Sequence, residues 1–311
     1  MRDGVNASRV AVTAGIGSTV EAFLAGRLPR VTDWPERLAR GEVLDEAGQP
    51  VAPGSACRAG AVLWYWRSLP PEPRVPFEID VLHQDEHLVV VDKPHFLPVT
   101  PAGRFLQETV LVRLKRLLGI ETLSPVHRLD RETAGLVLFS VQLGSRDAYQ
   151  ALLRQRRLHK VYEAVAPWRA ELAEPRTLED RLQERPGEAF MQMAVVPGPP
   201  NARTGLSMLG RSGDWALYQL EPETGVKHQL RAQMNARGAP LLGDRIYPEL
   251  WPHPAADEAP DYSGPLQLLA RELAFTDPLS GRARRFTSRK GLAPPGGGQN
   301  AWMPVGPACS T

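Results

Sequence analysis

Hydrophobic and polar residues follow two kinds of pattern along this chain. In residues 18–28 and 33–41, apolar positions recur at helical spacing behind a Ser/Thr or Asp start, which predicts two short helices. Short strands broken by Gly and Pro are predicted to follow them. Further along, the apolar run 136–141 follows a polar turn and a glycine, which predicts a buried strand.

The region after residue 80 is predicted to mix helices and strands. The predicted elements are strand 88–92, helix 109–118, strand 136–141, helix 146–157, strand 160–166 and a helix starting near Lys227. Several strands are predicted between 178 and 221 without an intervening helix, and 197–205 is predicted as a loop. Because such strands favour antiparallel pairing, we expect an α+β fold with a largely antiparallel mixed sheet rather than a doubly wound one.

Proline and glycine divide the chain into three parts. The proline-rich segment 70–77 favours extended backbone, which is typical of a linker. The end of the chain is rich in Gly and Pro with few charges, so we expect it to be flexible unless it docks. We therefore predict a small N-terminal α/β module with its linker over 1–72, a main domain over 73–290 and a tail over 291–311.

Composition narrows the class of protein. With 311 residues, 42% of them hydrophobic, the chain can bury a substantial core. It contains no run of 18 apolar residues, so we expect no membrane span or secretory signal and a cytosolic location. Cys57 and Cys309 suggest no disulfide framework. The histidines lack metal-binding spacing, so we expect no metal.

The formal net charge is only +2, yet the basic residues are clustered. The first cluster is Arg154, Arg156, Arg157, His159 and Lys160; the second is Arg113, Lys115 and Arg116; the third is Arg282, Arg284, Arg285, Arg289 and Lys290. Each cluster can contact phosphates without reading sequence. Each can equally be a solvated surface, so charge alone does not decide for RNA.

Candidate chemistry is concentrated in HRLDRETAGLVLFS, residues 127–140. Asp130 and Arg128 stand in a polar turn directly ahead of the predicted buried strand. This position places a carboxylate and a guanidinium on the rim of a cleft that a rigid sheet supports. An isolated aspartate in such a turn is most often a turn former or a cap, so the surrounding motifs have to decide its role.

The segment 127–140 resembles the signature of the RluA-type family of RNA pseudouridine synthases. Five other segments resemble that family's blocks in the same order: DEHLVVVDKPHFLPVTPAG (85–103), KVYEAV (160–165), ETGVKHQLRAQM (223–234), GAPLLGDRIYP (238–248) and LLARELAFTDPLSG (268–281). The resemblance implies an isomerase, an intramolecular transferase acting on RNA without a cofactor. It also implies the pseudouridine synthase catalytic domain over 73–290, and the N-terminal part resembles a degenerate α-L RNA-binding module.

The resemblance implies three catalytic residues. Asp130 matches the carboxylate that either attacks the anomeric carbon or removes the neighbouring proton, and the sequence does not choose between these routes. Arg231 matches the arginine expected to keep that carboxylate charged. Tyr162 matches a tyrosine whose ring stacks on uracil and whose hydroxyl handles protons.

Five more residues complete the predicted site as substrate-binding groups. The target uridine must be flipped out of folded RNA, and we expect Arg128 to fill the space that it leaves. His127 and Gln229 are expected to orient the loop and Arg231, respectively. Lys160 supports the wall beside the tyrosine, and Lys93 begins the Lys-Pro turn.

The sequence departs from the family pattern beside the predicted pocket. The changed positions are His95 and Phe96, where a small residue and Gly are usual; Val226 and Lys227, where Arg-Thr or Arg-Ser is usual; Gln233, where His is common; and Leu269, where His often precedes the alanine. These departures leave the RNA target open between 23S ribosomal RNA, transfer RNA or both.

Two alternatives from other classes stay open. A catalytically silent RNA-binding or ribosome-assembly protein would bind RNA equally well with Asp130→Asn. A hydrolase such as a nucleosidase or glycosidase would pair Asp130 with a second carboxylate, for which Glu132 and Asp244 are the candidates. A monomer is expected, because single-copy binding to a large RNA needs no symmetry.

Overall fold

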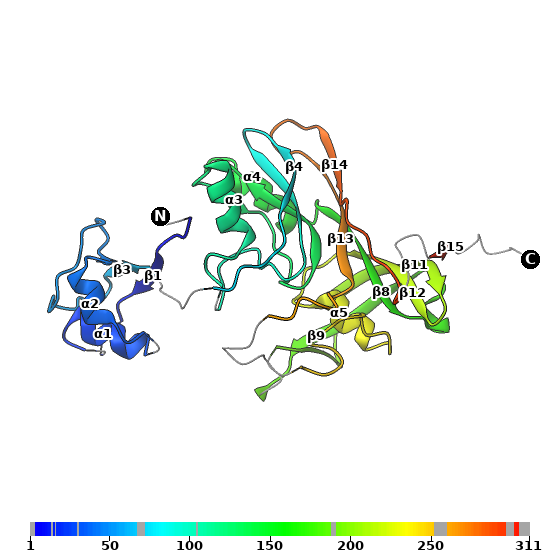
Figure 1. Cartoon of the computed structure of the whole chain (residues 1–311), viewed down its shortest axis with the longest axis horizontal. Coiled ribbons are helices and arrows are strands. Elements are labelled where there is room, and N and C mark those ends of the chain that lie inside the picture. The colour runs from blue at the N-terminus through cyan, green and yellow to red at the C-terminus, as the bar shows by residue number, and fades with distance from the viewer. Residues whose placement is uncertain are drawn as a thin grey trace, which may run out of the picture.

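The computed structural model describes residues 4–304 except 14, 16, 30, 67–71, 104, 188–190, 252–259 and 297–301. A small N-terminal module is joined to a larger body built on one long twisted sheet (Figure 1). The predicted α+β class with a largely antiparallel mixed sheet is confirmed. None of the described helices is long and apolar enough to cross a membrane.

The N-terminal module packs two helices on a three-stranded sheet. Its elements are β1 (Ser8–Ala11), α1 (Val20–Arg27), α2 (Trp34–Ala39), β2 (Val43–Leu44) and β3 (Val62–Tyr65), with the strands in the order β1-β3-β2. The Thr19 side chain caps α1 by accepting from Ala22 N at 3.2 Å. Both predicted helices are confirmed, but β1 was not predicted, because four alternating residues before a Gly-rich turn give little signal.

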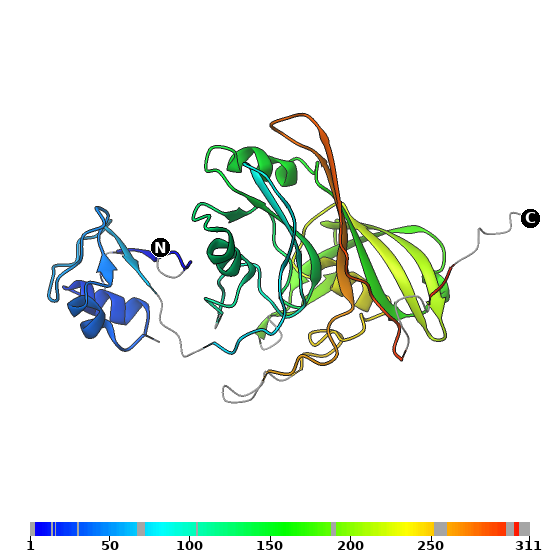
Figure 2. The same ribbon diagram turned by 45° about the horizontal axis from the view of Figure 1, so that its top comes forward.

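Within the described residues, the main sheet contains twelve strands. They are β4 (Asp80–Gln84), β5 (Leu88–Lys93), β6 (Ser124–Pro125), β7 (Ala134–Ser140), β8 (His159–Pro167), β9 (Arg176–Glu184), β10 (Met193–Val196), β11 (Ala202–Ser212), β12 (Trp215–Pro222), β13 (Leu268–Thr276), β14 (Ala283–Thr287) and β15 (Met303–Pro304). The central order is β10-β9-β11-β12-β8-β13-β7-β5-β4, and β13 with β7 is a parallel pair. Figure 2 shows β13 and β14 extending beyond the body of the sheet as a hairpin.

In the part of the chain that the structure describes, three α-helices and one short 3-10 helix cover this sheet: α3 (Val110–Leu118), α4 (Arg146–Arg154), α5 (Gln229–Asn235) and η1 (Ala170–Leu172). Alternate residues of β5 explain how both of its faces are covered. Val89 and Val91 pack in the cluster that holds α3, whereas Leu88 and Val90 pack in the cluster that holds α4. The predicted strand 88–92 is therefore buried on both faces, which explains its continuous apolar run.

Two predicted boundaries are wrong. The loop predicted over 197–205 ends at residue 201, because Ala202, Thr204 and Leu206 alternate inward on β11 and pair with β9. The helix predicted over 146–157 ends at Arg154, and Arg156 then takes a positive φ of 55°. The Pro and Gly residues of 197–205 and the arginines after Arg154 do not indicate where a strand begins or a helix ends, which explains both errors.

A glycine joins the two halves of the sheet. Gly135 has a φ of +108°, and a Cβ there would lie 2.3 Å from the carbonyl oxygen of Ala270. Only glycine permits this approach of β7 to β13. The close contact brings the loop before β7 to the middle of the sheet.

The described parts of the linker and the tail contact the main body. Glu72 accepts backbone N–H groups of Leu106 and Gln107 at 2.8 and 2.9 Å. In the tail, the Trp302 indole donates to Leu292 O at 3.2 Å, and β15 pairs with β11. Residues 70 and 71 of the predicted linker, and 297–301 and 305–311 of the tail, lie outside the described residues. The boundary at 72 stays a prediction.

Candidate active site

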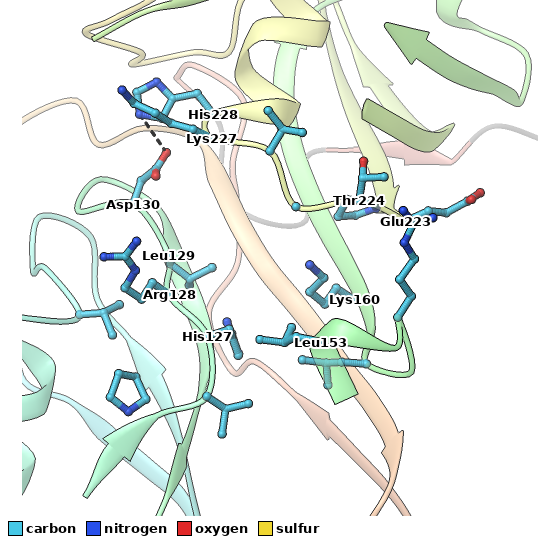
Figure 3. Close-up of a pocket in the computed structure, with 18 of the residues that line it drawn as sticks. His127, Arg128, Leu129, Asp130, Leu153, Lys160, Glu223, Thr224, Lys227 and His228 are labelled. Carbon is cyan, nitrogen blue, oxygen red and sulfur yellow. Dashed lines mark ion pairs between the residues drawn. The ribbon is translucent and has the colours of Figure 1, made fainter. Parts of the chain in front are cut away.

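A cleft of about 1780 Å³ opens beside the parallel strand pair. Four stretches of the described residues supply most of its lining: 98–100 with 102 and 105, then 125–131, then 153–154 with 156–160, and finally 221–228; Asn201 and Gly205 complete it. Figure 3 views this cleft, with Asp130 and His228 next to each other at one end and Lys160 further along it. Segments far apart in sequence thus meet where the HRLD loop enters β7.

The loop that carries Asp130 is fastened from behind. Thr133 N donates to Asp130 O at 3.2 Å, and Lys93 Nζ donates to Arg131 O at 3.0 Å. The His95 ring contacts Glu132 O at 2.7 Å through Nδ1. The backbone is therefore held while the Asp130 side chain, 35% exposed, faces the cleft.

Arg231 joins the Asp130 carboxylate to a second one. Its Nη1 donates to Asp130 Oδ2 at 2.9 Å, while Nε and Nη2 donate to the two oxygens of Asp244 at 2.8 and 2.7 Å. The Arg231 side chain is only 2% exposed. Burial lowers the pKa of Arg231, but its bonds to both carboxylates more than offset that effect, so the pKa lies above its usual value. A fixed cation thus stands beside Asp130.

Asp244 is held in a tight turn. Gly243 has a φ of +74°, and a Cβ there would lie 2.5 Å from Pro265 O. Asp244 Oδ1 also accepts from the backbone N–H groups of Ile246 and Tyr247 at 2.8 and 3.0 Å. The sequence named Asp244 as the possible second carboxylate of a hydrolase, and its bidentate ion pair with Arg231 was not predicted. The aspartate in the GDRIYP block was the available signal.

His228 was not among the predicted site residues. It directly precedes α5 with a left-handed backbone, φ 50° and ψ 24°. Its Nε2 lies 3.8 Å from Asp130 Oδ2, and its Nδ1 lies 3.5 Å from the Tyr247 hydroxyl (Figure 3 labels His228 and Asp130). Burial lowers the pKa of His228, which the charge of Asp130 opposes.

The two predicted residues on β8 lie at different depths. Lys160 lines the cleft, and burial lowers its pKa. Tyr162 is 9% exposed and belongs to an apolar cluster against which Leu129 packs, so it stands behind the cleft surface. Burial, and secondarily the charge of Asp130, raises the pKa of Tyr162.

His127 and Arg128 both line the cleft. The Nε2 of His127 accepts from Leu138 N at 3.3 Å, which ties the ring to β7. Burial and then the charge of Lys160 lower the pKa of His127 to about 3, so the ring is neutral. Arg128 is exposed beside Asp130.

The structure places Lys93 and Gln229 away from the cleft surface. Lys93 is buried and donates to the carbonyls of Pro94 and Leu97, both at 2.9 Å, besides Arg131. Burial lowers the pKa of Lys93 to about 7. Gln229 donates to Thr204 Oγ1 at 2.8 Å and accepts from Val226 N at 3.1 Å. It therefore braces the loop 223–228 instead of contacting Arg231 as expected.

Two of the departures from the family pattern, Phe96 and Gln233, have local explanations. Phe96 keeps a positive φ of 65° where the family usually has Gly, and it is buried against Phe77, with ring centroids 6.1 Å apart. Gln233 is completely buried, where it accepts from Thr204 Oγ1 at 2.6 Å and donates to Asp180 at 2.8 Å. The glutamine thus links α5 to β11 and β9.

The three basic clusters differ in their surroundings. All five members of the first cluster line the cleft. In the second, Arg113 donates to Val75 O and Phe77 O at 2.6 and 2.7 Å, and Lys115 is buried. In the third, Arg285 pairs with Glu272 at 2.9 Å on the β13–β14 hairpin. Only the first cluster therefore presents its charges to the cleft.

The described residues contain no group of three or more His, Cys, Asp or Glu side chains that could hold a metal ion. The site consists instead of one half-buried carboxylate, a buried arginine and a neighbouring imidazole. Such a carboxylate beside a fixed cation suits attack on a sugar carbon or removal of a proton.

Comparison with known proteins gives consistent matches. A family model for RNA pseudouridylate synthases matches residues 87–236. An uncharacterized RNA pseudouridine synthase of Synechocystis sp. is 36% identical over 217 residues, which cover 69% of this chain and 73% of that protein. The dual-specificity RNA pseudouridine synthase RluA of Haemophilus influenzae is 30% identical over 213 residues, covering 68% of this chain and 93% of that one.

The fold has a counterpart among solved structures. The human RNA pseudouridylate synthase domain containing 1 aligns with a TM-score of 0.59 at 19% identity, over 76% of this chain and 92% of that one. At this identity the likeness concerns the fold alone.

Proposed function

The chain belongs to the RluA-type family of RNA pseudouridine synthases, which are isomerases, and from this premise we propose that it isomerises specific uridines of structured RNA with Asp130 as the catalytic carboxylate. The observation that carries the proposal is the arrangement of Asp130, Arg231 and Asp244. It leaves one carboxylate facing the cleft next to a cation that cannot move away.

The reaction needs this combination of groups. It breaks the bond between uracil N1 and ribose C1′ and forms a bond between C5 and C1′, so uracil must detach, rotate and reattach. An ionised Asp130 either attacks C1′ or removes the proton on the neighbouring carbon, and both routes use an oxygen that faces the sugar. Arg231 donates to that carboxylate at 2.9 Å, and the buried contact of Arg231 with Asp244 fixes the direction of the guanidinium. The Tyr162 ring belongs to the apolar cluster against which Leu129 packs, and it supports the wall on which uracil rests.

RNA recognition is assigned to the rim of the cleft. Exposed Arg128 enters the stack in place of the flipped uridine. The first basic cluster contacts the phosphates. The N-terminal module over 1–72 adds RNA contacts to a catalytic domain over 73–290. The substrate class is structured RNA, 23S ribosomal RNA or transfer RNA, bound by a monomer in the cytosol.

The hydrolase alternative lacks a free second carboxylate among its two candidates. The Glu132 carboxylate accepts from Arg131 Nε at 2.8 Å. Both Asp244 oxygens are bonded to Arg231. A hydrolase would need one of these carboxyl groups to exchange protons with water or the leaving group, which their ion pairs oppose.

The test is a map of pseudouridine in total RNA from a strain lacking the gene, complemented with wild type, Asp130→Asn or Asp214→Asn. Asp214 is an exposed carboxylate at the β11–β12 turn and serves as the matched control. Sites restored by wild type and the control but not by Asp130→Asn support the isomerase and identify the RNA. No restored site with wild type, together with unchanged RNA binding, favours the silent RNA-binding protein.

A further inference from the structure

We propose that His228 is a further catalytic residue, whose Nε2 accepts the proton that leaves C5 of uracil after the new carbon–carbon bond has formed. The inference rests on the proposed function and names a base for its last step. It concerns a residue that lines the cleft beside Asp130 (Figure 3).

The last step moves one proton and no net electrons. When C5 has bonded to C1′, it still carries its hydrogen, and uracil holds a double bond between N1 and C6. A base removes the C5 proton, the C–H pair forms the C5–C6 double bond, and the N1–C6 π pair returns to N1, which takes up a proton. The product is an isomer of the substrate, so the step requires a proton acceptor and no oxidant or reductant.

The position of C5 at this stage restricts where the base can lie. C5 is then bonded to C1′, the carbon that faces Asp130, so the base must lie within a few ångströms of the Asp130 carboxylate. The Nε2 of His228 lies 3.8 Å from Asp130 Oδ2. Arg231, whose Nη1 lies 2.9 Å from the same oxygen, is a cation and cannot accept a proton.

The surroundings of the ring prepare Nε2 as the acceptor. Tyr247 packs edge-on against His228, with ring centroids 6.0 Å apart, and its hydroxyl lies 3.5 Å from Nδ1. In the tautomer that carries its hydrogen on Nδ1 and directs it at the Tyr247 oxygen, which also accepts from Met193 N at 2.6 Å, Nε2 is unprotonated and faces Asp130. The left-handed backbone at His228 is uncommon for a residue with a Cβ, and such conformations concentrate at functional sites.

Protonation states also favour His228 over the tyrosine. Burial lowers the pKa of His228, so its ring is available as a base near neutral pH. Burial raises the pKa of Tyr162, so its hydroxyl keeps its proton and is a poor acceptor at this stage. Loss of the C5 proton restores the conjugated uracil ring, and a modest base therefore suffices.

The test compares the isotope effect at C5 in wild type, His228→Gln and Tyr162→Phe. The substrate is a transcript containing the uridine identified by the pseudouridine map, made with either ordinary or 5-deuterated UTP. We expect His228→Gln to slow turnover about 10²-fold and to raise the isotope effect, because breaking the C5–H bond becomes rate-limiting. The isotope effect is a ratio within one preparation, so partial misfolding does not alter it.

A second variant and a remote histidine complete the experiment. His228→Ala should regain activity when imidazole is added, whereas His83→Gln, on β4, should keep the wild-type isotope effect. The proposal is overturned if His228→Gln retains the wild-type isotope effect, or if Tyr162→Phe alone raises it. If the wild type forms no pseudouridine, the proposed function and this inference fail together. If the wild type forms pseudouridine but the isotope effects do not change as expected, only the role of His228 fails.

Discussion

Two loops meet at Arg231, and each brings one carboxylate to the same guanidinium. The loop 243–247 contributes Asp244, whose side chain is fully buried and whose two oxygens are both bonded to Arg231. The HRLD loop contributes Asp130, which uses one oxygen for Arg231 and keeps an exposed side facing the cleft. The residue types are identical, but one carboxylate holds the arginine and the other remains available.

This difference between Asp244 and Asp130 explains how Arg231 can be fixed beside Asp130 without occupying both of its oxygens. A buried ion pair costs desolvation, which close bidentate geometry and backbone N–H donors offset at Asp244. The contacts that offset this desolvation lie at Asp244, away from the substrate. Arg231 is therefore already in place when Asp130 reacts, and it needs no reorganisation. Asp244 is thus the holding carboxylate and Asp130 the open one. Substituting each of them tests this division, and the largest effect is expected at Asp130.

Asp130→Asn removes the open carboxylate at nearly constant volume. Turnover should fall at least about 10⁴-fold, as for other residues that act directly on the substrate. The free energy of unfolding should change by less than about 1 kcal/mol, because a partly exposed ion pair contributes little. Single-turnover pseudouridine formation and denaturant unfolding measure the two effects. Activity within tenfold of wild type would contradict the role of Asp130.

Asp244→Asn removes the holding carboxylate and leaves a buried guanidinium half paired. We expect the free energy of unfolding to fall by about 3 kcal/mol, the usual result of removing one partner of a buried pair. Asp261→Asn is the matched control, since Asp261 pairs with Arg245 at 2.9 Å with its side chain 58% exposed. Denaturant unfolding should separate the two variants. Equal stability losses would mean that burial does not distinguish these ion pairs.

The sequence predicted most of the regular elements and the residues at the centre of the site. Strand 136–141 and helix 109–118 have unbroken apolar patterns and clear caps, so local physics fixes them. Asp130 and Arg231 were expected to meet, and they lie 2.9 Å apart. The direction of Gln229 could not be predicted, because it depends on the distant Thr204 of β11.

The charge of a residue did not predict whether its side chain is buried. Lys93 and Lys115 look like ordinary surface lysines next to apolar runs, yet both are buried. Lys93 reaches three backbone carbonyls that come together only when the HRLD loop docks on β5. Such contacts depend on tertiary packing, which no local pattern encodes.

His127 at the start of the HRLD loop should give the protein a pH-dependent stability. The pKa of His127 is lowered from 6.5 to about 3 in the folded protein, so below pH 6.5 the unfolded chain takes up a proton that the folded one does not. Stability from the neutral ring is present above pH 6.5 and declines toward pH 3. Between pH 7 and 5, wild type should lose about 2 kcal/mol more than His127→Gln. Parallel stability profiles from denaturant unfolding would contradict this.

The smallest effect is expected at the basic clusters. There too, the position of an arginine and not its residue type should decide whether it contacts RNA. Arg157 lines the cleft, whereas Arg285 pairs with Glu272 on the β13–β14 hairpin. A phosphate contact releases counterions, so Arg157→Ala should reduce the slope of log affinity against log salt by about 0.7 to 1, and Arg285→Ala should leave it unchanged. Filter binding of the substrate transcript across a salt series measures both slopes. Equal changes of slope in both variants would mean that RNA binding follows the overall positive charge. They would contradict the assignment of the RNA to the cleft.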